Sequence, residues 1–244
     1  MAHPSPIPLT LIERTCLNPQ SQADKVFHLK FASEARWQAG DLVDIEIGHE
    51  VRTYSIASAN APLELVARQM FNPQGAIGLG SGLLTQTLQV GQSIEAHIRV
   101  HPSFHAPANS VPMILIGAGT GIAGLRAHLQ ARPQGTRNWL IYGERSAKSD
   151  FWFADELNQA LKDQTLTRLD LAFSRDQAQK RYVQHVLIEA QDELRSWLEQ
   201  GAAMYVCGSL KGMGEAVHET LTHLLGEDHI KTLVAQQRYQ RDLY

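Results

Sequence analysis

The alternation of apolar and polar residues changes character part-way along the chain. Up to about residue 100, apolar side chains occupy every second position, as in KVFHLKF at 25–31. Side chains that alternate in this way belong to strands with one buried and one exposed face. The same alternation recurs in segments 8–15, 41–47, 53–58, 62–68 and 93–100. Several short strands separated by Gly, Asn and Pro predict an antiparallel β-barrel.

A different pattern follows from about residue 111. Short and nearly continuous apolar runs are typical of parallel strands that are buried on both faces. The runs are MILIGA at 113–118, WLIYGE at 139–144, LDLAFS at 169–174 and MYVCGS at 204–209. Between them, apolar residues recur at helical spacing over 151–161 and 183–197, and Gly201 and Gly226 follow positions where helices end. Alternating strands and helices predict a doubly wound parallel sheet.

The change of pattern predicts two domains. We expect an antiparallel β-barrel over residues 1–108 and an α/β domain over residues 109–244. A chain of 244 residues is long enough for both. Its content of 43% hydrophobic and 19% charged residues is typical of a folded globular protein.

Composition excludes several classes of protein. The net charge is -3 without a long run of either sign, so nothing indicates a nucleic-acid partner. No apolar segment is long enough to insert into a membrane, and the N-terminus has no signal-peptide pattern. Two cysteines, Cys16 and Cys207, are too few for a disulfide framework and indicate a reducing, cytoplasmic location. The 11 histidines lack ligand spacing, so no metal site is predicted.

A glycine-rich turn, GAGTGIAG at 117–124, directly follows the apolar run MILI. Gly119, Gly121 and Gly124 satisfy the GxGxxG spacing, and Glu144 lies at about the distance expected of a ribose-binding acid. Small residues let the backbone approach a pyrophosphate, and the following helix N-terminus favours its negative charge. The turn therefore predicts a nucleotide site, although a tight turn without a ligand has the same sequence.

A second polar motif, RTYSIAS at 52–58, lies in the predicted barrel. Arg52, Tyr54 and Ser55 provide a cation for phosphate, an aromatic face for a ring system and a hydroxyl donor. An ordinary strand could also contain these residues.

The segment SRDQAQKRYVQ at 174–184 bears on the choice of nucleotide. It follows a predicted parallel strand, so its side chains emerge where ligands of open α/β sheets bind. A 2′-phosphate requires cations and donors, whereas a free ribose hydroxyl favours a carboxylate. The segment offers two cations, a hydroxyl, an amide and an aromatic ring, which favours NADPH over NADH. These residues are Ser174, Arg175, Lys180, Tyr182 and Gln184.

Two further motifs, YVCGSLKGM at 205–213 and RYQRDLY at 238–244, complete a set of four in a characteristic order. The set resembles the ferredoxin-NADP reductase superfamily, and most closely the FAD- and NADPH-binding module of diflavin reductases of the sulfite reductase flavoprotein type. The resemblance covers nearly the whole chain. It implies a flavin-binding barrel, an NADPH-binding α/β domain and a C-terminal tail that returns to the flavin.

The resemblance also implies individual roles. Arg52 would hold the flavin phosphate, Tyr54 would contact the isoalloxazine ring, and GLGSGLL at 78–84, with Leu84 at its end, would meet the pyrophosphate. The terminal Tyr244 would stack on the flavin face that the nicotinamide must reach. The implied flavin residues are Arg52, Thr53, Tyr54, Ser55, Gly78, Gly80, Ser81 and Tyr244. The implied NADPH residues are Gly119, Thr120, Gly121, Ser174, Arg175, Lys180, Tyr182 and Gln184. Ser55, Cys207 and Asp242 would be catalytic, and FAD is favoured over FMN.

The chain departs from the family pattern at several points. Neither the helical connecting insertion nor a flavodoxin-like domain is expected, so the electron acceptor would be a separate protein or a small molecule. Gly124 stands where relatives carry proline, Ser209 where they carry an acid, and Gln69 where a tyrosine often stacks on the flavin adenine.

Three other functions fit parts of the sequence. A dehydrogenase with a bound substrate would need a catalytic constellation, for which His101 and His105 are candidates; we expect both to face solvent. A non-catalytic regulatory subunit would use the same fold without electron transfer. A reductase of free flavin would use the same nucleotide site.

Overall fold

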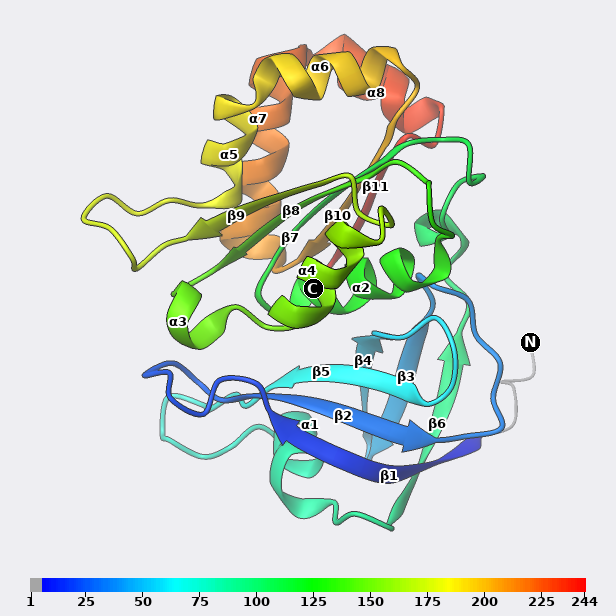
Figure 1. Ribbon diagram of the computed structural model, residues 1–244. Helices are drawn as coiled ribbons and strands as arrows, with labels where there is room; N and C mark the ends of the chain where they lie inside the picture. The colour runs from blue at the N-terminus through cyan, green and yellow to red at the C-terminus, as the bar shows by residue number, and fades with distance from the viewer. Residues whose placement is uncertain (1–5) are drawn as a thin grey trace.

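The structure is a computed structural model that describes residues 6–244, and it contains two sheets with helices between them (Figure 1). The first sheet holds the strands of the N-terminal part. They are β1 (Ile7–Cys16), β2 (Val26–Ala32), β3 (Leu42–Ile47), β4 (Glu50–Ser55), β5 (Leu63–Arg68) and β6 (Ser93–Arg99). The strand order is β4-β3-β6-β1-β2-β5, and every pair is antiparallel. The predicted barrel is confirmed, and β4 and β5 are its two edges.

The hairpin of β3 and β4 brings the RTYSIAS motif to one of these edges. Ile47 pairs with Glu50, and only Gly48 and His49 lie between the strands. The prediction of a strand over 53–58 was wrong for its second half, since β4 ends at Ser55. The chain then turns toward β5, and the Ala57 N–H donates to the Glu64 carbonyl (2.7 Å).

The second sheet is parallel throughout, as predicted. Its strands are β7 (Met113–Ala118), β8 (Asn138–Glu144), β9 (Arg168–Phe173), β10 (Ala203–Gly208) and β11 (Tyr239–Leu243). The strand order is β11-β10-β7-β8-β9. The strand β11 was missed, because its polar sequence YQRDL has no buried-strand pattern. As an edge strand it pairs on one side only, so continuous apolar character is not required.

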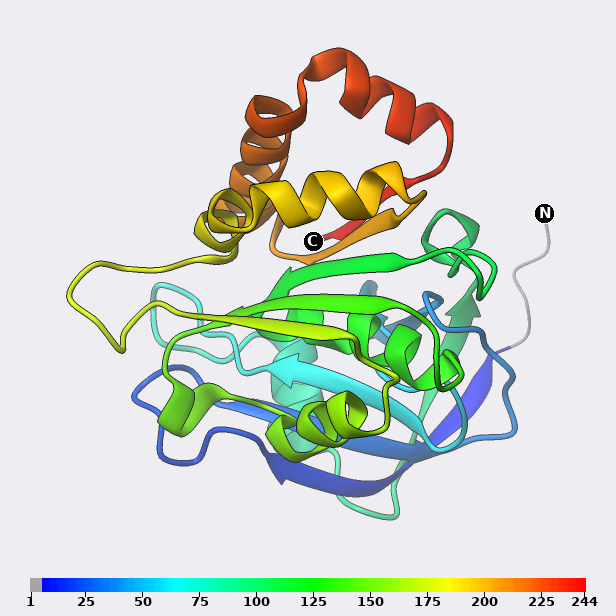
Figure 2. The same cartoon turned by 45° about the horizontal axis from the view of Figure 1, so that its top comes forward.

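Helices cover both faces of the parallel sheet (Figures 1 and 2). On the barrel side lie α2 (Ile122–Ala131), α3 (Ala147–Asp150) and α4 (Ala154–Lys162). On the other side lie α5 (Val183–Glu189), α6 (Gln191–Glu199), α7 (Glu215–Leu225) and α8 (Glu227–Ala235). The short α1 (Leu79–Gly82) belongs to the barrel. Single helical turns cover Leu83–Thr87, Pro102–Phe104, Gly119–Gly121 and Leu210–Gly214. None of the helices in residues 6–244 combines the length and the apolar content needed to cross a bilayer.

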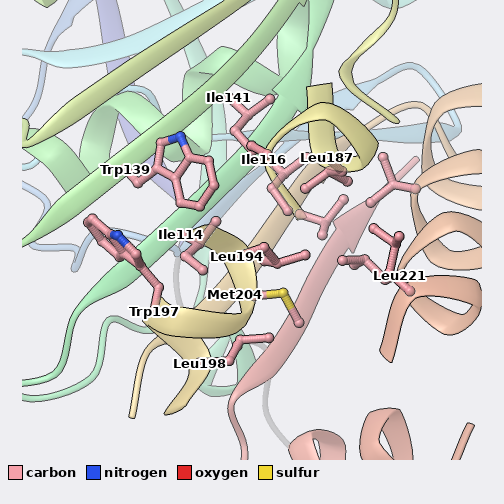
Figure 3. Close-up of a cluster of buried hydrophobic side chains, with 14 of the residues drawn as sticks. Ile114, Ile116, Trp139, Ile141, Leu187, Leu194, Trp197, Leu198, Met204 and Leu221 are labelled. Atoms are coloured by element: carbon pink, nitrogen blue, oxygen red, sulfur yellow. The ribbon is translucent and has the colours of Figure 1, made fainter. Parts of the chain in front are cut away.

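The outer core of the parallel sheet forms around two tryptophans (Figure 3). Trp139 of β8 and Trp197 of α6 have ring centroids 5.6 Å apart. Each indole N–H has an acceptor, Asp170 for Trp139 (2.6 Å) and Glu193 for Trp197 (2.7 Å). Large aromatic side chains can be buried here because their polar atoms are satisfied.

Two helical segments differ from the sequence pattern. The stripe over 183–197 is divided between α5 and α6, because Ala190 leaves the helical conformation (φ −102°, ψ 23°). The helix predicted over 151–161 begins only at Ala154, since Phe153 adopts a left-handed conformation (φ 58°). The apolar residues of both segments still face the core, so the amphipathic pattern located the buried faces but not the breaks.

The helix α2 carries a histidine into the core between the sheets. His128 is fully buried, with the rings of Phe104 and Tyr205 each 5.3 Å away. Burial disfavours the charged imidazolium and lowers the pKa of His128 from 6.5 to about 3.

This burial predicts a pH dependence of stability. Between about pH 3 and 6.5 the unfolded chain binds a proton at residue 128 and the folded chain does not, so acidification favours unfolding. The contribution amounts to about 1.4 kcal/mol per pH unit below the unfolded pKa. Urea unfolding of wild type and His128→Leu between pH 5 and 7 should show a shallower dependence for the variant. Identical slopes would contradict the assignment, whatever the absolute stabilities.

Candidate functional site

Two cavities lie where the sheets meet. The first, which we call the barrel cavity, has a volume of ≈ 680 Å³ and lies between the edge strands β4 and β5 and the short helix α1. All the flavin residues predicted from the sequence line it. They are Arg52, Thr53, Tyr54, Ser55, Gly78, Gly80, Ser81 and Tyr244. A barrel with an open edge therefore assembles motifs that are nearly 200 residues apart in the chain.

The second, which we call the sheet cavity, has a volume of ≈ 610 Å³ and lies at the carboxyl ends of β7, β8 and β9. Six of the predicted NADPH residues line it, namely Gly119, Thr120, Ser174, Arg175, Tyr182 and Gln184. Gly121 and Lys180 do not line it. The two cavities share four residues, Arg68, Thr120, Ser209 and Tyr244, so they meet at one place.

The strand β4 presents its polar residues toward the barrel cavity. The guanidinium of Arg52 is partly exposed and pairs with Glu50 on the same strand. Thr53 donates to Asp44 (2.7 Å) and accepts from Arg99 (2.7 Å), which fixes its hydroxyl. Tyr54 is half-buried, and burial raises its pKa to about 12, so the phenol stays protonated.

The GLGSGLL segment closes one wall of the barrel cavity. A Cβ on Gly80 would lie 2.8 Å from Arg52 Cγ and 2.9 Å from Tyr54 Oη, so only glycine lets α1 approach β4 this closely. Ser81 Oγ accepts from the Met70 N–H (3.1 Å), which ties the segment to the chain after β5. Leu84 is fully buried in the barrel core and anchors the segment rather than lining the cavity.

Gln69 does not take the place of an adenine-stacking ring. Its side chain is buried and donates to Thr85 (3.2 Å), away from the cavity, which Met70 lines instead.

The glycine turn needs small residues because it packs closely against β10, as well as to leave space for a ligand. Gly119 has a left-handed conformation (φ +59°), which favours glycine. A Cβ on Gly121 would lie 2.0 Å from the Cys207 carbonyl oxygen, so the turn can lie against β10 only without a side chain there. Gly124 is less crowded, since its Cβ would lie 3.4 Å from Cys207 Sγ.

The three predicted catalytic residues lie together. Ser55 Oγ donates to Asp242 Oδ2 (2.6 Å), and Cys207 Sγ donates to the same oxygen (3.6 Å). The pairing of β10 with β11 places Cys207 opposite Asp242. Only Ser55 lines a cavity, while Cys207 is fully buried behind it. Burial and the charge of Asp242 raise the pKa of the Cys207 thiol well above its ordinary value, so it acts as a donor and not as a nucleophile.

Tyr244 separates the two cavities. Its phenol is hydrogen-bonded to Thr120 Oγ1 (2.8 Å), and the residue as a whole remains 57% exposed. Its main chain is fixed by two bonds, from the Tyr244 N–H to Gly208 O (3.1 Å) and from the Leu210 N–H to Tyr244 O (2.9 Å). The backbone is therefore held by β10 while the side chain has one polar contact to lose.

The sheet cavity is strongly cationic. Arg68, Arg145, Arg175 and Lys211 line it, against a single carboxylate from Glu144. Glu144 is itself paired with Arg68 (3.3 Å). Burial raises the pKa of its carboxyl, against the opposing charge of Arg68. A cavity with this balance of charge favours an anionic ligand.

Comparison with known proteins shows what the chain is similar to. Residues 115–219 match the oxidoreductase NAD-binding domain. The chain is 34% identical, over 91% of its length, to the sulfite reductase (NADPH) flavoprotein alpha-component of Shewanella oneidensis, of which it covers 40%. It is 36% and 38% identical to the corresponding proteins of Vibrio vulnificus and Yersinia enterocolitica over 79% of its length, covering 35% and 36% of them. The chain is therefore similar to NADPH flavoproteins over most of its length, and to an oxidoreductase NAD-binding domain over residues 115–219. It spans about two fifths of the length of the relatives it matches.

Several residues that line the two cavities were not predicted from the sequence. Arg68 ends β5 and reaches both cavities, and Arg145 and Lys211 add cations to the sheet cavity. The positions of Arg145 and Lys211 in the sequence could have indicated their role. Both follow the carboxyl ends of strands, β8 and β10, where ligands of open α/β sheets bind.

The histidine candidates for a dehydrogenase lie away from both cavities. His105 Nε2 is 2.6 Å from Asp41, and the His101 N–H donates to the same carboxylate (2.9 Å). The prediction that both face solvent was wrong, because both are half-buried, and neither lines the barrel or sheet cavity. Among residues 6–244, no group of three or more His, Cys, Asp or Glu side chains could hold a metal ion.

The crowding at the glycine turn predicts opposite effects of two substitutions. Gly121→Ala should destabilise the protein by about 1–3 kcal/mol or more, because the new methyl group meets backbone. Gly124→Ala, in α2, should be neutral or stabilise by about 0.5–1 kcal/mol, because glycine is unfavourable inside a helix. Urea unfolding of both variants measures the difference. Equal stabilities would contradict the packing account.

Proposed function

We propose that this chain is an NADPH-dependent flavin oxidoreductase that binds FAD in the barrel cavity and NADPH in the sheet cavity. When bound, these groups would supply hydride transfer from the nicotinamide to the flavin and onward release of electrons. The observation that carries the proposal is the meeting of two cavities at Tyr244, beside the cluster of Ser55, Cys207 and Asp242. The similarity to NADPH flavoproteins over most of the chain supports it.

The barrel cavity suits a flavin in shape and charge. Arg52 would hold a phosphate, for which it would exchange its partner Glu50, and the ring of Tyr54 offers a flat apolar surface. Glycine at position 80 lets α1 pack directly against Arg52 and Tyr54, so the backbone of Gly78 and Gly80 forms a wall of the cavity. FAD is preferred over FMN, although Gln69 offers no ring for adenine.

The sheet cavity suits NADPH. Gly119 and Thr120 would face the pyrophosphate at the N-terminal end of α2. Arg175 is exposed without a carboxylate partner in the described chain, so it is available for a 2′-phosphate. Tyr182 and Gln184 line the adenine end, and Lys180 would contribute as a nearby cation only after a loop rearrangement.

The chain's own residues would position the reacting groups. Ser55 lines the barrel cavity and is oriented by Asp242, so its hydroxyl would meet the edge of a bound ring. Cys207 would fill space behind it as a protonated thiol. Asp242 would hold or release a proton through Ser55.

The electron acceptor is proposed to be a separate protein or a small molecule. The domain division at residue 108 and a cytoplasmic location also remain our predictions; the two free cysteines support the location.

The proposal is tested with the purified chain. We expect it to bind FAD, to bind FMN more weakly, and to lose the absorbance of the oxidised flavin on anaerobic addition of NADPH, more efficiently than with NADH. A protein that takes up no flavin would contradict the proposal. A flavin-bound protein that NADPH cannot reduce would favour the regulatory alternative, and rapid turnover with free flavin alone would favour the free-flavin reductase.

The contact between Tyr244 and Thr120 predicts a role in selectivity. Tyr244→Ser keeps the main-chain bonds to Gly208 and Leu210 but removes the ring, so the nicotinamide site is open without movement. We expect the ratio of kcat/KM for NADPH over that for NADH to fall at least about tenfold, the equivalent of 1.4 kcal/mol. Deletion of Tyr244 should act in the same direction. Steady-state selectivity that is unchanged in both variants would remove Tyr244 from the mechanism.

A further inference from the structure

The edge strand β5 has two faces with different partners. Leu63, Leu65 and Ala67 point into the barrel core. The alternate residues Glu64, Val66 and Arg68 point to the α/β part, since strand side chains alternate between faces. The strand pairs only with β2, and its outer face is left to contact the α/β part.

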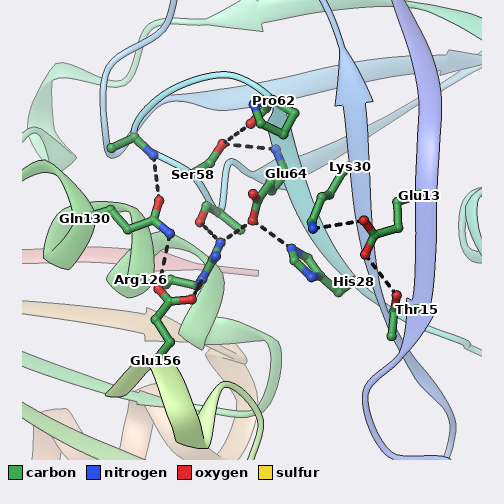
Figure 4. A network of polar contacts seen from close by, with 12 residues as sticks. Glu13, Thr15, His28, Lys30, Ser58, Pro62, Glu64, Arg126, Gln130 and Glu156 are labelled. Atoms are coloured by element: carbon green, nitrogen blue, oxygen red, sulfur yellow. Dashed lines mark hydrogen bonds and ion pairs between the residues drawn. The ribbon is translucent and has the colours of Figure 1, made fainter. Parts of the chain in front are cut away.

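The central contact is a guanidinium on α2 that joins the two sheets (Figure 4). Arg126 pairs with Glu64 of β5, and its Nη1 also donates to Ala57 O in the β4–β5 loop (2.7 Å). Its Nε donates to Glu156 of α4 (2.8 Å). The other oxygen of Glu156 accepts from Gln130 (3.2 Å), which in turn accepts from the Ala59 N–H (3.1 Å). We call this group the Arg126 clasp.

Burial fixes the geometry of the Arg126 clasp. The side chains of Arg126 and Glu64 are 8% and 11% exposed, and the guanidinium lies 4.6 Å from the Phe153 ring. Burial alone would raise the pKa of Glu64, but the hydrogen bond from His28 (2.8 Å) and the charge of Arg126 hold it below its ordinary value. A buried charged pair keeps its partners at fixed separation, because either partner alone would be left desolvated.

The Arg126 clasp joins β5 and α2, and both of these elements lead to residues that line the two cavities. Four residues after Glu64, or about 13 Å along β5, Arg68 reaches both cavities. Six residues before Arg126, in the single turn Gly119–Gly121 that leads into α2, Thr120 lines both cavities and holds Tyr244. A displacement of α2 relative to β5 therefore changes the distance between the cavities directly.

We propose that Arg126, through Glu64, is a positioning residue that sets the separation of the flavin and nicotinamide sites. The proposal rests on the function proposed above. Neither residue lines a cavity, so neither touches a ligand. Loss of the pair lets α2 and β5 shift while each cavity keeps its own lining. Hydride transfer is sensitive to such shifts, since a misplacement of about 1 Å can cost on the order of 100-fold in rate.

The test compares two carboxylates that contact the same guanidinium. Glu64→Gln weakens the pair between the sheets, whereas the control Glu156→Gln weakens a pair within the α/β part. We expect Glu64→Gln and Arg126→Gln each to lower the rate constant for flavin reduction at saturating NADPH by about tenfold or more. Glu156→Gln should lower it less than twofold. The NADPH concentration at half-saturation, the flavin content and the rate of reduction by dithionite should stay within twofold of wild type.

A double variant checks that the two residues act through their contact. Glu64→Gln with Arg126→Gln should be no slower than the slower single variant, since the second change removes an interaction already lost. Arg126→Lys keeps the charge but not the planar guanidinium, so its rate constant for flavin reduction should lie between those of wild type and Arg126→Gln. This variant replaces Arg126→Gln in the test if Arg126→Gln does not fold. Thermal unfolding of each variant confirms folding.

The proposal is overturned by an unchanged saturating rate in Glu64→Gln, or by an equal fall in Glu64→Gln and Glu156→Gln. A fall that follows loss of flavin would also overturn it, because it would show damage to the barrel. Wild-type protein whose bound flavin NADPH does not reduce would instead contradict the proposed function.

Discussion

The unpaired edge between β4 and β5 is the constraint on which the site depends. A closed barrel would satisfy its backbone within itself, whereas this sheet ends in two strands whose ladders each have one partner. The edges are covered from outside, by α1 near β4 and by the helices of the parallel sheet near β5. The gap that remains is the barrel cavity. The open barrel therefore provides both a cavity and the surface on which the second sheet is held.

In the α/β part, a close approach of two backbone segments brings the residues of the site together. Gly121 allows the glycine turn to lie against the Cys207 carbonyl, which brings Thr120 of that turn within hydrogen-bonding distance of the C-terminal residue. The strand β11 then delivers Asp242 to Ser55 and Tyr244 to the junction of the cavities. Groups from four separate segments meet because one turn has no side chain at one position.

The sequence predicted which residues line the cavities better than it predicted the contacts between them. Most motif residues line the expected cavity, since motif spacing reflects local turns that short segments specify. Arg68, Arg145 and Lys211 were missed, because a position at or after a strand end does not by itself show whether a cation faces a cavity or solvent. Glu144 illustrates the limit in the other direction: its spacing indicates a ribose acid, whereas its contact with Arg68 comes from a strand more than seventy residues away.

By itself the sequence determined the two sheet types, the buried faces of the helices and the local glycine turns. These depend on periodicity and on backbone conformation, which neighbouring residues fix. Only the tertiary structure decided that β11 joins the parallel sheet, that α5 and α6 are separate helices, and that Arg126 joins β5 to α2. Those outcomes arise from contacts between distant segments, whose energy depends on geometry that appears only when both sheets have formed.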